Sequence, residues 1–206
     1  RRYGYERWTT QWEELVAVLS TDLDSVADSR LRQDLLHRLG EITDKLGDAQ
    51  RAIAYLQRAL EYVPRDDKAL AGLDALMTGH EMWAALADIL ERRIEVAGEP
   101  GAKSVLLERL AGVWGDKLMD AEAALRCHKQ ILEIDPDHPI TLKSMQKLYA
   151  ELSDWDSLAK NLQRQAEVLT EPDEQVRVHA AAGELYAEEL GDMGEAIAHW
   201  QKVVEF

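Results

Sequence analysis

The stretch KLGDAQRAIAYLQRALEYVP, residues 45–64, occurs again in altered form as KLMDAEAALRCHKQILEIDP at residues 117–136 and as ELGDMGEAIAHWQKVVEF at residues 189–206. Matched residues of the three copies lie 72 positions apart, in the series Asp48, Asp120 and Asp192 and the series Ala52, Ala124 and Ala196. Similarity at a fixed period of this length is typical of a protein built from stacked structural repeats. The repeat therefore decides the fold class before any single motif is considered.

Each period contains enough sequence for four helices, which is two helix-turn-helix units. Good helix formers dominate the chain, and no stretch alternates β-branched and aromatic residues as a strand would. We expect about twelve helices, at residues 1–9, 10–26, 28–46, 49–63, 66–78, 81–97, 102–118, 121–134, 138–151, 154–169, 173–190 and 193–206. These helices would form six units, at residues 1–27, 28–66, 67–100, 101–137, 138–172 and 173–206.

Within the first copy, residues of matching size and spacing are Leu36, Leu39, Gly40, Thr43, Ala52, Leu56, Ala59 and Pro64. This order resembles the tetratricopeptide repeat family, except that Thr43 stands where an aromatic residue is expected. The later copies carry the resemblance at Leu107, Leu110, Ala111, Trp114, Ala124, His128, Ile131 and Pro136, and at His179, Ala182, Gly183, Tyr186, Ala196, Trp200 and Val203. Both later copies have one extra residue before the shared alanine.

The resemblance implies an all-α fold, a right-handed α-solenoid of antiparallel helix pairs that forms a single domain over residues 1–206. The intervening units carry Leu86 and Leu158 where the stronger units carry alanine, each preceded three residues earlier by tryptophan. Because alanine permits closer helix contact, we expect tight and loose helix pairs to alternate along the chain. The apolar residues at the C-terminal end, Val203, Val204 and Phe206, favour a fragment of a longer protein or association through the ends.

Acidic residues outnumber basic residues by 39 to 24, which gives a formal net charge of −15. Such a surface repels the phosphate backbone, so we expect no nucleic-acid partner. The acidity either keeps a helical surface soluble or complements a basic ligand. The single cysteine, Cys127, cannot form an internal disulfide, and no apolar run reaches the length of a membrane span. We therefore expect no membrane insertion, and the cysteine usage favours a cytoplasmic location.

Candidate catalytic, cofactor and metal sites all have simpler structural explanations. Cys127 and His128 are adjacent on a predicted helix, so their side chains point about 100° apart and cannot pair as nucleophile and base. His128 takes the position of Leu56 and Trp200 in the sister copies, which predicts a role in the core. The histidines show no spacing of a metal site, and paired acids are typical of solvated helix surface. We predict no catalytic residue, no cofactor and no metal.

In the tetratricopeptide repeat family, the first helix of each unit lines a concave groove that holds partner peptides or helices. Transferred to this sequence, the groove residues are Asp34, His37, Glu41, Asp44, Glu108, Asp116, Lys143, Lys147, Glu151, Arg177, Glu184 and Glu188. Acidic side chains are in excess, so a peptide or helix that carries lysine and arginine fits this groove best. The lysine and asparagine pattern with which one family subtype clamps a C-terminal carboxylate is missing.

The repeat, together with the failed search for a catalytic pattern, predicts a non-enzymatic scaffold for protein–protein interaction. A second hypothesis is a structural array that forms homo-oligomers through its apolar ends. A third is a helical-toroid enzyme, which would require a carboxylate pair on loops at one mouth of the toroid. The short predicted loops oppose this third hypothesis.

Overall fold

The structure, a computed structural model, describes the backbone of residues 2–205 and the side chains of residues 10–23 and 25–205. Within that range the secondary structure is entirely helical, which confirms the expected all-α fold. The elements are α1 (Arg2–Ser25), α2 (Ser29–Lys45), α3 (Ala49–Tyr62), α4 (Asp67–Gly79), α5 (Trp83–Val96), α6 (Pro100–Gly112), the π-helical turn η1 (Val113–Lys117), α7 (Ala121–Ile134), α8 (Pro139–Glu151), α9 (Trp155–Val168), α10 (Pro172–Glu188) and α11 (Met193–Glu205).

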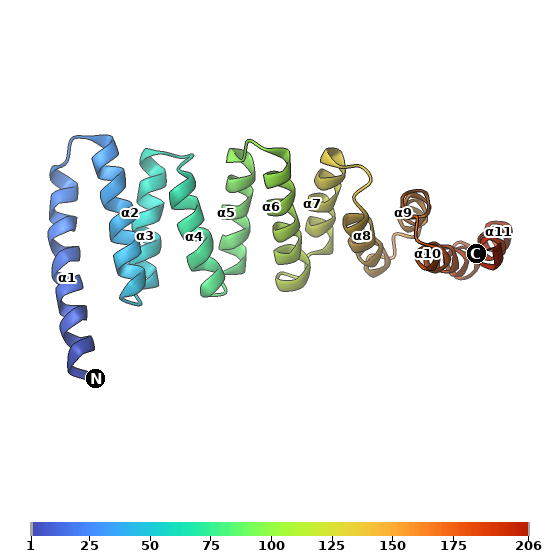
Figure 1. The fold of residues 1–206 in the computed structure, drawn as a ribbon, viewed down its shortest axis with the longest axis horizontal. Coiled ribbons are helices and arrows are strands. Elements are labelled where there is room, and N and C mark those ends of the chain that lie inside the picture. Colours follow the sequence, from blue (N-terminus) through green and yellow to red (C-terminus); the bar gives the residue numbers. More distant parts are fainter. Residues whose placement is uncertain (1, 206) are drawn as a thin grey trace. The chain divides into compact units, whose positions relative to one another are not determined.

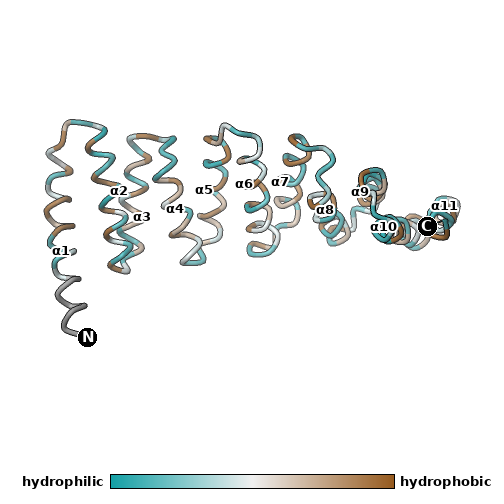
Figure 2. Tube along the Cα trace, in the orientation of Figure 1, coloured by the Kyte–Doolittle hydropathy of each residue, from teal (hydrophilic) through white to brown (hydrophobic). Residues whose placement is uncertain are grey.

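The chain divides into two compact units, Arg1–Ala97 with helices α1 to α5 and Gly98–Phe206 with helices α6 to α11. Inside each unit, successive helices pack against each other in chain order and run in opposite directions (Figure 1). The described helices carry both hydrophobic and hydrophilic residues along their length (Figure 2). Each helix therefore needs a neighbour to cover its apolar stripe, as expected for stacked repeats.

The predicted break between residues 9 and 10 is wrong, because α1 continues from Arg2 to Ser25 as one helix. No proline lies in this stretch to remove a backbone donor, so the helical hydrogen-bond ladder runs through. The helix packs against α2 and buries Val16 and Leu23. The described part of the chain consequently has eleven α-helices where about twelve were expected.

Aspartates begin several helices, as their positions in the sequence predicted. Asp48, Asp120, Asp154 and Asp192 each accept a hydrogen bond from the backbone N–H three residues later, at distances of 2.8–3.2 Å. Such a cap satisfies a donor that the helix itself leaves free, and it stabilises a helix by about 1 kcal/mol. Because these four caps recur in the 72-residue series, they place the helix starts at matched positions of the repeat.

Five turns between paired helices share one left-handed backbone conformation. The residues that adopt it, with φ between 54° and 79°, are Gly47, Glu81, Met119, Ser153 and Gly191. Successive members of this series lie alternately 34 and 38 residues apart, so the 72-residue period consists of two units of unequal length. Glycine adopts this conformation freely, whereas a residue with a Cβ carries a penalty of roughly 1–2 kcal/mol.

The extra residue of the second and third copies is accommodated at the end of the first helix. In the first copy, the N–H of Asp48 reaches back five residues to the carbonyl of Thr43, at 2.9 Å. In the second copy, the N–H of Asp120 reaches back six residues to the carbonyl of Trp114, at 2.8 Å, and the chain forms η1. The third copy closes its turn with the same six-residue bond. A wider helical turn holds one residue more than an α turn, so the next helix keeps its register.

The expected alternation of tight and loose pairs is confirmed inside each unit. In the first unit, α2 and α3 share more extensive backbone contact than α4 and α5. In the second unit, the pairs α6/α7 and α10/α11 both exceed the pair α8/α9 in this respect. The loose pairs bury Leu86 and Leu158 at the position that alanine holds in the tight pairs. The larger side chain separates the two backbones, as ridge-into-groove packing requires.

The matched alanines of the tight pairs have equivalent surroundings, since Ala52, Ala124 and Ala196 are each at most 1% exposed. In the first pair, Leu56 lies so close to Gly40 that a Cβ there would be only 3.0 Å from the leucine side chain. The pair therefore depends on small residues at the crossing of the two helices.

Candidate functional site

Pockets open between the first helices of neighbouring units, where the sequence predicted a groove. In the unit Arg1–Ala97 one pocket lies between α2 and α4, and in the unit Gly98–Phe206 one lies between α6 and α8 and another between α8 and α10. We call them the α2/α4, α6/α8 and α8/α10 pockets. In the first two, the second helix of the pair supplies a side chain from the same repeat position, Leu56 and His128.

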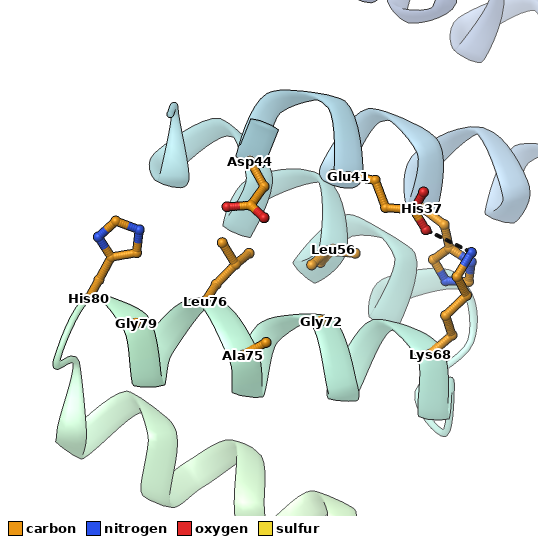
Figure 3. A pocket seen from close by; sticks show the side chains of 11 residues that line it. His37, Glu41, Asp44, Leu56, Lys68, Gly72, Ala75, Leu76, Gly79 and His80 are labelled. Carbon is orange, nitrogen blue, oxygen red and sulfur yellow. Dashed lines mark ion pairs between the residues drawn. The ribbon is translucent and has the colours of Figure 1, made fainter. Parts of the chain in front are cut away.

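The α2/α4 pocket has a volume of about 260 Å³ and combines an apolar floor with a charged rim. Leu56 and Leu76 lie at its floor, and Glu41 and Asp44 project from α2 toward α4 (Figure 3). Lys68 approaches from α4. Concave sites that join an apolar surface to a few polar groups are typical of ligand recognition, because the apolar part gives affinity and the polar part gives specificity.

The rim of the α2/α4 pocket has a net negative charge. The Nζ of Lys68 lies 3.1 Å from Oε1 of Glu41, and both side chains are more than half exposed. An ion pair this exposed contributes less than about 1 kcal/mol, so a cation from a ligand can replace Lys68 at little cost. Asp44 forms no ion pair in the part of the chain that the structure describes.

His37 also lines this pocket, but it differs from the expected groove residue because it is buried and already bonded. Its Nε2 lies 2.6 Å from Oδ2 of Asp66, which also accepts a hydrogen bond from Gln33 at 2.6 Å. Burial by itself would raise the pKa of Asp66, but the hydrogen bonds from Gln33, the Ala69 backbone and His37 outweigh it and hold that pKa below its usual value. His37 therefore connects α2 to the cap of α4 and is a structural residue.

The α6/α8 pocket has a volume of about 320 Å³ and a mixed rim of Glu108, Asp116 and Lys147. His128 of α7 lines it together with Ala124, and its Nδ1 is buried without a hydrogen-bond partner among the described residues. Burial lowers the pKa of His128, with the charge of Glu108 acting in the opposite direction. The imidazole is therefore neutral near pH 7. The predicted core role is only partly right, because His128 is half-buried and faces a pocket.

The α8/α10 pocket has a volume of about 520 Å³ and the opposite charge character. Lys143 of α8 and Arg177 of α10 line it, with Glu174 as the one acidic residue. Neither cation pairs with a carboxylate among the described residues. The apolar lining comes from Pro139, Ile140, Leu169 and Val178.

Amide side chains form one wall of the α8/α10 pocket. Gln165 is buried, and its Nε2 donates to Oδ1 of Asn161 at 2.7 Å and to Oε1 of Gln146 at 3.1 Å. Gln146 and Gln165 both line the pocket. Amide groups that hold each other in place offer fixed donors and acceptors, which suits recognition of a peptide backbone.

Eight of the twelve predicted groove residues line one of the three pockets, and four do not. The eight are His37, Glu41 and Asp44, then Glu108, Asp116 and Lys147, and then Lys143 and Arg177. The other four, Asp34, Glu151, Glu184 and Glu188, are exposed on the same helices outside these pockets. Glu151 pairs instead with Lys147, at 3.7 Å.

Sequence reasoning missed the contribution of the second helices. Leu56, His128 and Trp200 hold one repeat position, and the first two lie at the bottom of a pocket. Their change of side chain within an otherwise constant pattern was the signal that could have found them. Lys68 was also missed, because it faces Glu41 only through the packing of α4 against α2.

Two searches of the described residues add to this picture. No group of three or more histidine, cysteine, aspartate or glutamate side chains in that part of the chain is arranged to hold a metal ion. None of the helices described there combines the length and the apolar character that crossing a membrane requires.

Comparison with known proteins identifies the repeat. The sequence model of the tetratricopeptide repeat matches residues 33–66, the segment whose spacing carries the resemblance. No curated protein sequence matches the chain.

Solved structures resemble the chain in fold. A structure of MamA from AMB-1 superposes with a TM-score of 0.53 and 17% identity, over 86% of this chain and 92% of that one. A second MamA structure gives 0.50 and 14% identity, over 84% and 90%. A structure of YrrB, described as a TPR protein with an unusual peptide-binding site, gives 0.49 and 18% identity, over 83% and 84%. At these identities the two MamA structures show a shared fold only.

Proposed function

We propose that this chain, which contains a tetratricopeptide repeat at residues 33–66 and has an all-α fold of that type, is a protein-interaction scaffold whose first helices hold a peptide or a helix of a partner protein. The observation that carries the proposal is the row of pockets between first helices, each with an apolar lining and charged groups on its rim. Repeat folds carry their function on such surfaces.

In the unit Arg1–Ala97, the α2/α4 pocket fits a large apolar side chain next to lysine or arginine. Glu41 and Asp44 provide two carboxylates above Leu56 and Leu76. A ligand cation would compete only with Lys68, which is held by a single exposed ion pair. The formal net charge of −15 would speed the approach of such a basic segment.

In the unit Gly98–Phe206, the α8/α10 pocket fits a segment with the opposite charge. Lys143 and Arg177 are exposed and form no ion pair with the described carboxylates. A carboxylate next to an apolar side chain would meet both cations and the surface of Ile140 and Val178. The predicted acidic groove is thus proposed for the first unit, and a basic pocket for the second.

Two labelled peptides test this proposal with the full chain. Each contains a central leucine, flanked by lysine and arginine in one peptide and by glutamate in the other, and binding is measured by fluorescence anisotropy. The double variant Glu41→Gln/Asp44→Asn should weaken binding of the basic peptide about tenfold, which is roughly 1.4 kcal/mol. Lys143→Gln/Arg177→Gln should weaken only the acidic peptide, by a similar factor.

The matched control is Glu61→Gln/Glu91→Gln, which removes the same charge from exposed positions outside the pocket. We expect this control to change the affinity for the basic peptide by less than about twofold. Equal losses from the control and from the pocket variant would mean that general charge attraction, and not the α2/α4 pocket, binds the peptide.

A further inference from the structure

Helix α11 presents an apolar stripe that no other described helix covers. Met193, Ile197, Trp200 and Val204 lie at helical spacing on one face and are 54%, 48%, 38% and 86% exposed. Among the described elements, α11 packs only against α10. Four large apolar side chains on one helix face are a site for a partner.

The same repeat positions are buried on the two sister helices. On α3, Leu56 and Leu60 match Trp200 and Val204, and they are 6% and 5% exposed. On α7, Leu125 matches Ile197 and is also buried. The cover is supplied by the next first helix, since α4 packs on α3 and α8 packs on α7. The stripe of α11 is therefore a third copy of a surface that is closed by a helix at both other places.

The two covering helices share a short pattern, LAGLDALM at residues 70–77 and LKSMQKLY at residues 142–149. Positions one, four, seven and eight of the pattern are buried and apolar, and they are Leu70, Leu73, Leu76 and Met77 in α4, and Leu142, Met145, Leu148 and Tyr149 in α8. The third position is small, Gly72 or Ser144. A Cβ on Gly72 would lie 2.9 Å from Cδ1 of Leu56, so the residue opposite the position shared with Trp200 must be small.

We infer that α11 binds an amphipathic helix, supplied from outside residues 1–206, that has this eight-residue pattern: leucine, any residue, glycine or serine, leucine or methionine, any two residues, leucine, and methionine or tyrosine. The small third residue faces Trp200, and the four apolar residues cover Ile197 and Val204. This surface is distinct from the charged pockets between the first helices.

A second copy of residues 1–206 does not fit this surface. Both covering helices, α4 and α8, are first helices of their units and are already packed inside each copy. Helix α1 carries Trp12, which matches Trp83 of α5 and Trp155 of α9 in the 72-residue series. Helix α1 is therefore a second helix, and its stripe is used against α2. The occupant must be a first-type helix that this copy does not contain.

The probe is a blocked synthetic peptide with the sequence of residues 66–80, DDKALAGLDALMTGH, added to the full chain. Binding is followed by NMR at the indole N–H of Trp200 and at the α11 amides. We expect saturable shifts confined to α11 and its contacts with α10. A second peptide with Gly72→Leu is a better helix former, yet it should bind at least tenfold more weakly because leucine collides with Trp200.

The protein variant is Ile197→Asp, which changes an exposed residue and leaves the fold intact. It should weaken binding of the first peptide at least tenfold. The matched control is Val105→Asp on α6, where the side chain is 64% exposed and lies outside the α11 stripe. This control should bind like the unchanged chain.

A short peptide is only partly helical in water, so a second measurement joins the same 15 residues behind residue 206 through a flexible linker of ~20 residues. The linker raises the effective concentration to the millimolar range, and amide exchange in α11 should slow at least tenfold. The inference is overturned if neither form of the peptide changes α11. It is also overturned if the chain alone forms a dimer that Ile197→Asp converts to a monomer, because a second copy would then be the occupant.

Discussion

Leu56 and Trp200 hold the same repeat position but have different surroundings. Leu56 is 6% exposed and lies between Gly40 on one side and Gly72 on the other. Trp200 is 38% exposed, and its ring lies against Gly183, where an added Cβ would be 2.3 Å from the indole nitrogen. In both pairs a glycine on the first helix makes room for the large residue of the second. The crossing is thus held by the glycine, while the residue above it is free to change.

The polar contacts of the two regions differ in the same way. His37 bonds to Asp66 and so connects its helix pair to the next unit. His179 instead has its Nδ1 3.0 Å from Nδ1 of His199, inside the pair α10/α11. The ring of His199 also stacks on Tyr186, with centroids 5.6 Å apart. One histidine therefore ties units together, whereas the other strengthens a single hairpin.

The largest effect that tests this comparison is expected from truncation of the shared position. Leu56→Ala should lower the free energy of unfolding by about 2–5 kcal/mol, because it leaves a cavity between two glycines. Trp200→Ala should lower it by about 1 kcal/mol or less, since one side of the ring already faces solvent. Urea unfolding measures both. Leu31→Ala, on an exposed part of α2, is the control and should change stability by less than about 0.5 kcal/mol. Equal costs at residues 56 and 200 would contradict the comparison.

A second prediction concerns pH and separates the two histidine regions. Burial lowers the pKa of His179, and the charges of Lys202 and His199 lower it further. Burial also lowers the pKa of His199, with Lys202 acting in the same direction and Glu195 opposing it. The unfolded chain binds these protons at its usual pKa of about 6.5 while the folded chain does not, so stability is complete above that pH and falls below it.

The Asp66 region should respond only at lower pH. Its pKa is held below the usual value of about 3.9, so its contribution is present above that pH and is lost as the pH falls through the folded-state pKa. Hydrogen exchange, corrected for intrinsic rates, should therefore show loss of protection in α10 and α11 between about pH 6.5 and 5, and in α2 and α4 only below about pH 4.

Matched variants assign each step to its residue. His199→Gln should remove the step near pH 6, and Asp66→Asn should remove the acid step while leaving the other. If the α10 and α11 amides keep full protection at pH 5, the neutral histidine pair does not stabilise the hairpin.

The smallest effect is expected at the turns, where copies differ in the residue with positive φ. Gly47→Ala should cost roughly 1 kcal/mol, because alanine is strained at φ 79°. Met119→Gly should add up to about 1 kcal/mol, because it relieves the same strain at φ 56° and the methionine side chain is 82% exposed. The thermal midpoint measures both changes. Met82→Gly is the control, since Met82 lies at φ −83° and glycine there should not stabilise.

The sequence predicted those parts of the fold that depend on local pattern. The caps at Asp48 and Asp192 and the buried Ala52 and Ala196 follow from spacing within one or two helices. The unbroken α1 was missed, because nothing local marks where a helix continues through a repeat boundary.

The pockets were harder to predict, because they depend on contacts between helices far apart in sequence. His37 looked like a groove residue until Asp66, 29 positions later, was found to bond it. The acidic groove was likewise inferred from one helix at a time. Lys143 and Arg177 come from α8 and α10, and only their packing into one pocket gives the second unit its basic site.

The turns at Gly47, Glu81 and Met119 also have an evolutionary consequence, since their spacing alternates between 34 and 38 residues. Duplication of a 34-residue or a 38-residue segment alone would place two like pairs next to each other, either tight on tight or loose on loose. Duplication of 72 residues preserves every junction. A gene that lengthens this array, or a designer who extends it, is therefore expected to add helices four at a time.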